Sequence, residues 1–420
     1  MDYSSYTTSS GIKINNVFSH DFKTSTVCVE FYVPLDSKNA SYISLLCAVL
    51  KRGNKKYGEM DKICEFLNKN YGASFSISTS KKGDLQRFAL ASSFIDDRFT
   101  LDGEKVADNI VSLIVSTLAE PIFDDSFVEQ EKRNLKDFIA SLINDKRMYS
   151  LEKCKQTMFK DDVYGIYEQG DPTVIDTITT TSLKEYFKTL LFESMLFVGY
   201  AGAKRDTKAL FKPLIDMLDS GKRPLFATKV NSGVKEVTYK TEPMNVAQSK
   251  LNLGFRLGDN AKSDLFALRV FNEMYGGSPT SKLFNNVRER LSLCYYCASA
   301  IDTFKNVMFV YSGIETENYE KARDEILNQL ELMKKGEFST EEFENARAGI
   351  IDSYTQMGDS LAALLSNKVY CDMQGIDLTP KMHIEQIKKV TPERVIDIAK
   401  QVTLDTVYLL KGVGGDADAN

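Results

Sequence analysis

The chain has 420 residues, of which 43% are hydrophobic and 26% are charged. This length exceeds what one hydrophobic core usually organises, so we expect two or more domains, and the composition excludes a disordered or fibrous protein. The formal net charge of −5 argues against the broad basic surface that binds a phosphate backbone. Nucleic acid is therefore not an expected partner.

The cellular location is predicted from three features. No segment approaches the ~20 uninterrupted apolar residues of a membrane span, and the opening MDYSSYTTSSGIK lacks the basic start and apolar run of a secretion signal. The seven cysteines are odd in number and scattered through apolar segments, as is typical of reduced thiols. We expect a cytoplasmic protein with no membrane partner.

Cysteine and histidine offer little catalytic chemistry. Cys294 and Cys297 form a local pair, but an offset of three along a strand would turn their side chains to opposite faces. No second pair completes a zinc site, so we interpret them as two packed thiols. His20 and His383 are the only histidines, and neither has a neighbourhood typical of a metal ligand or a base.

The first half of the chain is predicted to begin with a half-buried strand that alternates in polarity and ends near Asp36. Helices, two paired strands, a block of helices and a closing strand follow. The predicted ranges are 26–36 (strand), 41–54 (helix), 60–70 (helix), 71–80 and 85–95 (strands), 103–120 and 126–145 (helices), 179–190 (short helix) and 194–202 (strand).

The second half repeats this order at an offset of about 220 residues. Its first strand ends near Asp259, as the first strand of the chain ends near Asp36, and Ser339 or Thr340 is a suitable N-cap for one of its helices. The matching ranges are 249–260 (strand), 263–277 and 281–291 (helices), 293–300 and 305–315 (strands), 318–336 and 339–357 (helices), 391–402 (short helix) and 405–413 (strand).

This duplication predicts an α+β protein of two homologous domains, each an antiparallel sheet backed by helices. The stretch between the halves carries Gly, Pro, Ser and Asn without apolar periodicity and is predicted to be a linker. We therefore predict an N-terminal domain over residues 1–221, a linker over 222–233 and a C-terminal domain over 234–420.

Several motifs resemble the insulinase/pitrilysin-like metallopeptidases, the family of the mitochondrial processing peptidases and the core subunits of bc1 complexes. The most specific is YGGSPTSKLFNNVRERLSLCYY, and the others are GDPTVIDTITTTSLKEYF, STEEFENARAGI and KKVTPERVIDIAKQ. The resemblance covers nearly the whole chain and is strongest to a bacterial, cytoplasmic branch with two unequal subunits. It implies the mitochondrial-processing-peptidase-like metallohydrolase fold.

In that family, an H-x-x-E-H motif on the first helix of the first half binds zinc, and its Glu activates the metal-bound water. The resemblance places Ser44 and Ala48 at the two His positions and Cys47 at the Glu position. Neither histidine of the chain is near this helix. The N-terminal domain is therefore predicted to contain a degenerate zinc site that binds no metal.

The family's further zinc ligand is a Glu on a later helix. The resemblance places Glu131 at the first of two family Glu positions and Phe138 at the second, the ligand position, although another register would place Asp137 there. A phenyl ring cannot coordinate zinc. Glu131 lies in a run of charged residues, from which we expect a solvated helix face.

Arg288 and Tyr295 fall on family positions where an Arg and a Tyr face the zinc and bind the peptide substrate. Without the resemblance they would be interpreted as a surface ion-pairing residue and a sheet residue, and both interpretations stay open. In two-subunit members, the subunit that keeps Arg and Tyr but lacks zinc completes the site of a zinc-bearing partner.

The resemblance thus implies a non-catalytic subunit of a heterodimeric peptidase, inactive alone, with zinc expected only on the homologous partner. The alternative is a structural or peptide-binding scaffold of the same fold with no role in hydrolysis. An independent hydrolase with other chemistry is a third hypothesis. The sequence does not identify the peptide substrate, the pathway or the oligomeric state of the isolated chain.

Overall fold

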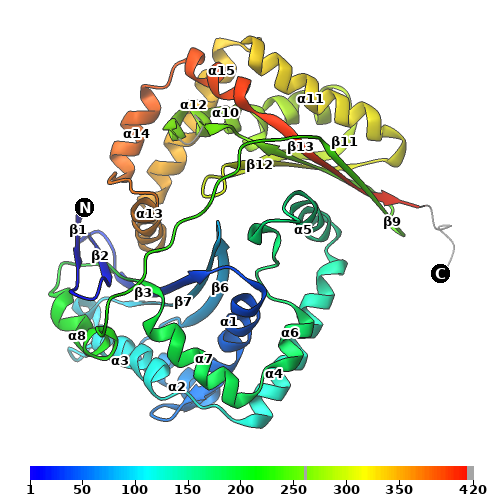
Figure 1. Ribbon diagram of the computed structural model, residues 1–420. Coiled ribbons are helices and arrows are strands. Elements are labelled where there is room, and N and C mark those ends of the chain that lie inside the picture. The colour runs from blue at the N-terminus through cyan, green and yellow to red at the C-terminus, as the bar shows by residue number, and fades with distance from the viewer. Residues whose placement is uncertain (260–262, 414–420) are drawn as a thin grey trace. The chain divides into compact units, whose positions relative to one another are not determined.

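The computed structural model describes residues 1–259 and 263–413, and the chain divides into two compact units (Figure 1). Unit 1 consists of Met1–Ala140, Ile166–Ala227 and Met357–Thr379. Unit 2 consists of Ser141–Gly165, Thr228–Gln356 and Pro380–Asn420. Among the described residues, no helix has the length and apolar character that crossing a membrane requires.

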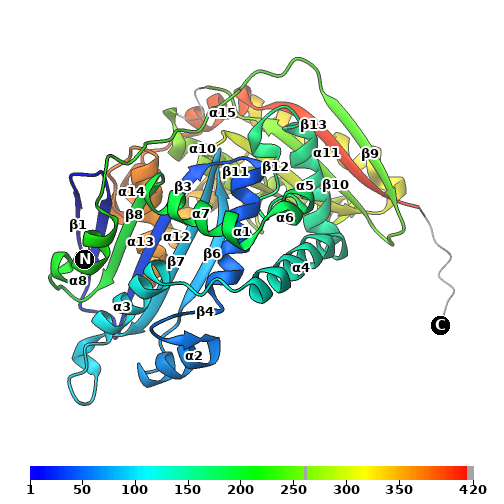
Figure 2. The ribbon, with the colours of Figure 1, turned by 60° about the horizontal axis from the view of Figure 1, so that its bottom comes forward.

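Unit 1 contains a six-stranded sheet in the order β1-β2-β8-β3-β7-β6, and Figure 2 shows β3, β7 and β6 side by side. The strands are β1 (Asp2–Thr7), β2 (Lys13–Phe18), β3 (Thr24–Pro34), β6 (Ser76–Lys82), β7 (Leu85–Ile95) and β8 (Met195–Gly202). A separate short hairpin joins β4 (Gly53–Asn54) to β5 (Gly58–Glu59). The helices are α1 (Ser37–Leu50), α2 (Met60–Lys69), α3 (Val106–Ala119), α4 (Asp125–Ser141), α6 (Pro172–Thr177), α7 (Thr180–Phe192), α8 (Thr207–Leu218) and α13 (Leu361–Met373).

Unit 2 contains a five-stranded sheet in the order β11-β12-β10-β13-β9. The strands are β9 (Thr238–Met244), β10 (Ser249–Arg256), β11 (Cys294–Asp302), β12 (Val307–Ile314) and β13 (Thr403–Gly412). The α-helices are α5 (Lys146–Met158), α10 (Leu265–Asn272), α11 (Tyr319–Lys335), α12 (Thr340–Met357), α14 (Pro380–Lys388) and α15 (Pro392–Gln401). Two π-helical segments, η4 (Glu273–Gly277) and η5 (Leu283–Arg290), precede β11.

The two sheets share one topology, because β2-β8-β3-β7-β6 corresponds to β9-β13-β10-β12-β11 strand by strand. The predicted α+β class and the duplicated order of elements are confirmed. One detail differs from a purely antiparallel sheet: β2 pairs with β8, and β9 with β13, in parallel. The strands β2 and β9 were not among the predicted elements, because their partners β8 and β13 lie more than 150 residues further along the chain. The edge strand β1, which pairs with β2, was not predicted either.

The central strand β3 is buried on both faces. Val27, Val29 and Phe31 pack in the core that includes residues of α1, α3 and α7, whereas Cys28 and Tyr32 pack against apolar residues of α13. This alternation follows from the period of two along a strand. The sheet of unit 1 is therefore a layer between the helices of its own half and a helix contributed by the second half.

The exchange of helices is reciprocal. Helix α13 packs on β2, β3 and β8 of unit 1, and α5, which holds the matching place in the first half, packs on β10 and β13 of unit 2. A glycine allows each close approach: a Cβ at Gly199 would lie 2.7 Å from Cδ1 of Leu365, and one at Gly254 would lie 2.5 Å from Sδ of Met158.

The exchange makes the compact units differ from the predicted contiguous domains 1–221 and 234–420. Residues 141–165 lie in unit 2 and residues 357–379 lie in unit 1. The chain passes between the units at Ala227 and Thr228, within 222–233, where it forms no helix or strand. The order of elements along a chain does not determine which sheet a helix covers, so this exchange could not be predicted from the repeat.

Candidate functional site

Helix α1 carries the three positions of the degenerate zinc motif. Asp36 caps its N-terminus, accepting a hydrogen bond from the Asn39 amide at 2.6 Å. After its C-terminus, Gly53 has a φ of +147°, and a Cβ there would lie 2.3 Å from the Gly58 carbonyl oxygen. Gly53 is therefore required at the turn that follows α1, because a side chain at position 53 would clash.

The three motif positions offer no ligand set for zinc. The Ser44 hydroxyl donates to the Glu168 carbonyl at 3.2 Å, Cys47 is buried in the core of unit 1, and Ala48 presents only a methyl group. Burial raises the pKa of the Cys47 thiol to about 12, so the thiol is protonated near neutral pH. The residues of this site do not fit a zinc ion.

Helix α4 corrects one prediction. Glu131 is 9% exposed rather than solvated, and its carboxylate accepts a hydrogen bond from Nε of Arg52 at 2.6 Å and one from Nδ2 of Asn134 at 3.2 Å. The Arg52 guanidinium also lies 5.5 Å from the centre of the Phe127 ring. A charged run predicts solvent contact, but here Arg52, which follows α1 and is partly exposed, supplies a counter-ion that the local sequence does not show.

The remaining α4 positions carry no ligand cluster. The Phe138 side chain is 57% exposed, and Asp137 beside it is exposed as well. Within the described parts of the chain, no group of three or more His, Cys, Asp or Glu side chains could hold a metal ion. Of the two histidines, His20 is exposed, while His383 is buried and stacks on Tyr354 with ring centroids 4.9 Å apart.

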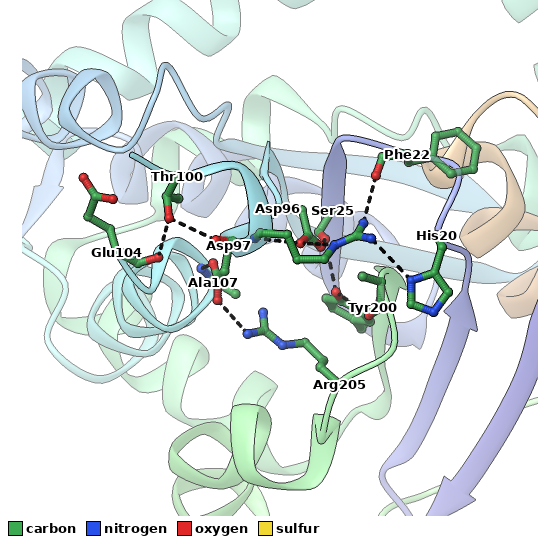
Figure 3. A network of polar contacts seen from close by, with 12 residues as sticks. His20, Phe22, Ser25, Asp96, Asp97, Thr100, Glu104, Ala107, Tyr200 and Arg205 are labelled. Carbon is green, nitrogen blue, oxygen red and sulfur yellow. Dashed lines mark hydrogen bonds and ion pairs between the residues drawn. The ribbon is translucent and has the colours of Figure 1, made fainter. Parts of the chain in front are cut away.

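A polar network at one end of the unit 1 sheet involves His20 but offers no catalytic arrangement (Figure 3). The Ser25 hydroxyl donates to Asp96 at 2.9 Å and lies 3.1 Å from the Tyr200 hydroxyl. Nε of Arg98 donates to Asp96 at 2.8 Å, and its Nη1 lies 3.3 Å from Nδ1 of His20. The imidazole therefore contacts a cation rather than the serine, and the network links β3, β8 and the end of β7.

Arg288 and Tyr295 lie in one open cleft of unit 2. This cleft of about 340 Å³ is lined by Arg288, Glu289, Ser292, Leu293, Cys294, Tyr295, Glu315 and Asn318. Arg288 stands near the end of η5, with its guanidinium 4.6 Å from the Phe284 ring centre and Nε 3.4 Å from Oε1 of Glu289. Ser292, with a φ of +51°, then turns the chain into β11.

Tyr295 projects from a β-bulge. In the β11–β12 pair, Cys294 faces Ile314 and Tyr296 faces Gly313, so Tyr295 is the extra residue. Its ring is 55% exposed, and its hydroxyl donates to the Glu315 carboxylate. This hydrogen bond raises the pKa of the Tyr295 phenol, which therefore stays protonated and able to donate near neutral pH.

The bulge also corrects the prediction for the cysteine pair. Cys294 and Cys297 are both buried, at 9% and 3% exposure, in agreement with the predicted packed thiols, but they do not face opposite sides. In a regular strand the offset of three would separate them, but the extra residue restores the same face. All seven cysteines are free thiols.

Glu315 is a cleft residue that sequence reasoning missed. It follows β12 directly, and the pairing of Cys294 with Ile314 brings it beside Tyr295. The predicted hairpin of strands 293–300 and 305–315 contained this signal, because antiparallel strands place the start of one beside the end of the other. In contrast, no sequence pattern predicted the β-bulge that directs Tyr295 toward Glu315.

Comparison with known proteins relates the whole chain to M16-type peptidases. The family described as "Peptidase M16 inactive domain" matches residues 177–350. The probable inactive metalloprotease YmfF of Bacillus subtilis is 29% identical and aligns over 96% of this chain and 97% of its own length. The uncharacterized zinc protease YmxG of the same organism is 22% identical over 74% of this chain and 77% of its own length.

Solved structures show the same fold. A conserved protein from Enterococcus faecalis, 27% identical, superposes with a TM-score of 0.89 over 98% of this chain and 99% of its own. A peptidase M16 inactive domain from Pseudomonas fluorescens, 16% identical, superposes with a TM-score of 0.81 over the full length of both chains. Together with the degenerate motif on α1, these matches confirm the resemblance seen in the sequence: the chain is similar to M16 peptidases, including relatives described as inactive.

Proposed function

We propose that this chain is the zinc-less, non-catalytic subunit of a heterodimeric M16 peptidase, and that Arg288 and Tyr295 bind the peptide at the active site of a zinc-bearing homologous partner. The observation that carries the proposal is that these two donors share one open cleft, while α1 holds no metal ligands. Bacillus subtilis has relatives named for both roles, a probable inactive metalloprotease and a zinc protease, which supports a pairing of this kind.

The chemistry of the two side chains suits substrate binding. The guanidinium of Arg288 is 41% exposed and is paired in the structure only loosely with Glu289, so its planar fork is able to grip carbonyl or carboxylate oxygens. The Tyr295 phenol stays protonated and donates to Glu315. A substrate carbonyl would replace Glu315 as its acceptor, and the phenol would then stabilise charge that develops on that oxygen.

We propose the cytoplasm as the compartment, which the free thiols support because reduced cysteines are typical of a reducing compartment. Zinc would be held only by the partner. The chain alone would not hydrolyse peptides, because none of its described residues supplies an activated water or a nucleophile with a nearby base.

The test is peptide turnover by this chain, by a purified zinc-bearing homologous subunit, and by the two mixed. We expect turnover only in the mixture, and we expect Arg288→Ala and Tyr295→Phe each to lower kcat/KM roughly a hundredfold, the usual effect of removing one preorganised donor. Matched controls are Arg290→Ala, two residues further along η5, and Tyr239→Phe, an exposed phenol on β9. Both controls should leave turnover unchanged, with circular dichroism confirming that every variant folds.

Other outcomes would select the alternatives. Full turnover with both cleft variants, or with the partner alone, would contradict the proposal and favour a scaffold of the same fold. Turnover by this chain alone after exhaustive chelation would favour an independent hydrolase. A scaffold that binds peptide without cutting it would still show peptide binding that depends on the cleft.

A further inference from the structure

Arg147, in the first turn of α5, lies over two tyrosine rings of the unit 2 sheet. Its Cζ atom is 4.9 Å from the ring centre of Tyr296 and 4.7 Å from that of Tyr311. The two rings come from the neighbouring strands β11 and β12, and their centres are 6.4 Å apart. A guanidinium that packs over aromatic rings keeps the N–H donors along its edge available for an anion.

The register of the sheet brings a second cation to the same ring. Lys250 of β10 pairs with Gly313 of β12, which pairs with Tyr296 of β11, so the three residues form one row across the sheet. The Tyr296 ring lies over Gly313, where a Cβ would be 2.5 Å from Cε1 of the ring. Nζ of Lys250 is 5.8 Å from the Tyr296 ring centre. The ring of Tyr296 therefore contacts two cations.

Neither cation forms an ion pair with a carboxylate within the described part of the chain. Nζ of Lys250 donates to the neutral Gln248 side chain at 3.1 Å, and burial and next the charge of Arg147 lower the pKa of Lys250. The carboxylate of Asp145 caps α5 by accepting from the Met148 amide at 3.0 Å. Two like charges without a counter-ion repel each other, and an anionic ligand between them would remove this cost.

The same face of the sheet carries a buried donor without an acceptor. Asn252 lies two residues beyond Lys250 on β10 and pairs with Tyr311 of β12. It is 1% exposed, and its Nδ2 has no hydrogen-bond partner among the described residues. Burial also raises the pKa of the Tyr296 phenol to about 12, so this group is protonated and uncharged near neutral pH. The cluster thus offers positive charge and donors but no anion.

We propose that Arg147 and Lys250, together with the rings of Tyr296 and Tyr311, form a binding site for the carboxylate of a peptide. The carboxylate accepts two parallel hydrogen bonds from the edge of the Arg147 guanidinium and one from the Lys250 ammonium group. The tyrosine rings contact the apolar part of the peptide, which favours an organic anion over an inorganic one. The C-terminus and an acidic side chain share this chemistry.

This site is separate from the cleft of Arg288 and Tyr295, because none of its residues lines that cleft. The inference does not depend on the proposed function, since it concerns binding to this chain alone and no hydrolysis. Failure of turnover in the mixed pair would leave it standing, and failure of carboxylate binding would leave the proposed role of the cleft standing.

The test is isothermal titration calorimetry of the full chain with three N-acetylated peptides at low salt. The first is an otherwise uncharged hexapeptide that ends in Leu with a free carboxylate, the second is its C-terminal amide, and the third is that amide with one internal Glu. We expect at least one carboxylate peptide to bind about tenfold more tightly than the amide, and to bind more weakly as salt is added. Tighter binding of the first peptide identifies the C-terminus as the ligand, and tighter binding of the third identifies a side chain.

Variants assign the binding to this site. Arg147→Gln and Lys250→Gln should each weaken binding of the carboxylate peptide at least about tenfold. Lys153→Gln is the matched control, because Lys153 is a cation of the same helix that lies over Tyr149 instead, and it should bind as the wild type does. Circular dichroism checks that each variant folds.

Three results would overturn the proposal. In the first, both carboxylate peptides bind no more tightly than the amide, a comparison that uses only the wild-type chain. In the second, folded Arg147→Gln binds the carboxylate peptide as tightly as the wild type. In the third, inorganic phosphate binds more tightly than either carboxylate peptide.

Discussion

The carboxylate of Glu131 accepts a hydrogen bond from Nε of Arg52 at 2.6 Å, which joins the end of α1 to α4. Arg52 lies one helical turn beyond Ala48, the second of the two lost histidine positions. An ion pair therefore connects the two helices that carry the predicted positions of the degenerate zinc site. A buried charge that loses its partner is costly, so this pair has a measurable role in stability.

Removing one member of the pair should destabilise unit 1. We expect Glu131→Ala to lower the free energy of unfolding by about 2 kcal/mol, because the Arg52 guanidinium is left without its partner. In the double variant Arg52→Met/Glu131→Ala, the free energy of unfolding should fall by less than the sum of the decreases in Arg52→Met and in Glu131→Ala. Urea unfolding followed by circular dichroism measures each value.

The matched control is Glu65→Gln, which breaks the exposed Lys62–Glu65 pair on α2. It should leave the unfolding midpoint unchanged, because solvent screens exposed ion pairs. If Glu131→Ala unfolds at the same urea concentration as the wild type, the Arg52–Glu131 contact does not contribute to the stability of the fold.

The chain purified without chelator should contain no stoichiometric zinc. Ser44, Cys47 and Ala48 cannot reproduce a set of two imidazoles and a carboxylate, and the high pKa of Cys47 disfavours a thiolate ligand. Elemental analysis after dialysis gives the metal content. One zinc per chain that survives dialysis and disappears in Cys47→Ser would show that the site has been misread.

The close approach of α13 to β8 predicts a steric effect at Gly199. A Cβ there would lie 2.7 Å from Leu365 and 2.9 Å from Sγ of Cys28, so we expect Gly199→Ala to destabilise unit 1 by about 1–3 kcal/mol. Gly233→Ala is the control, because its nearest atom, Oδ1 of Asn231, is 3.6 Å away. Thermal unfolding compares the two variants.

Shortening the neighbour gives a second arm of this test. In the double variant Gly199→Ala/Leu365→Ala, the clash with Leu365 is removed and only the contact with Sγ of Cys28 remains, so the combined loss of stability should be smaller than the sum of the two single losses. Strict additivity would mean that α13 does not pack on β8 at this position.

His383 predicts a loss of stability in acid. Burial, and next the charge of Arg269, lower its pKa to about 4, whereas an unfolded histidine titrates near 6.5. As the pH falls below about 6.5, His383 becomes protonated in the unfolded chain but not in the folded chain. The free energy of unfolding is therefore highest above pH 6.5 and decreases as the pH falls toward 4. We expect a loss of about 2 kcal/mol between pH 7 and pH 5 from this residue.

The variant His383→Phe keeps an aromatic ring between Tyr354 and Phe266 but does not titrate. Its stability should fall less than that of the wild type over the same pH interval, as measured by urea unfolding at each pH. His20→Gln is the control and should follow the wild-type curve, because His20 is exposed. Identical curves for the wild type and His383→Phe would refute the assignment.

Local patterns along the chain were enough for many of the helices and strands and for their duplication, because amphipathic periods and caps act over a few residues. The helices α5, α6, α8, α13 and α14 were not among the predicted ranges. Ser339, one of the two suggested N-caps, does accept from the Glu342 amide at 3.0 Å, and Glu342 bonds back to the Ser339 amide at 2.7 Å. The loss of the zinc motif at Ser44, Cys47 and Ala48 was likewise evident from the sequence alone, because a change in packing does not change which side chains occupy these positions.

Only the tertiary structure decided which partners distant residues find. The burial of Glu131 depends on Arg52, which lies 79 residues earlier, and the exchange of α5 and α13 depends on which sheet each helix covers. The bulge at Tyr295 belongs to the pairing of β11 with β12, and it reverses the faces that a regular strand would give to Cys294 and Cys297. Hydrophobic patterning determines that a segment is buried, but the register and partner of that segment are set by the whole fold.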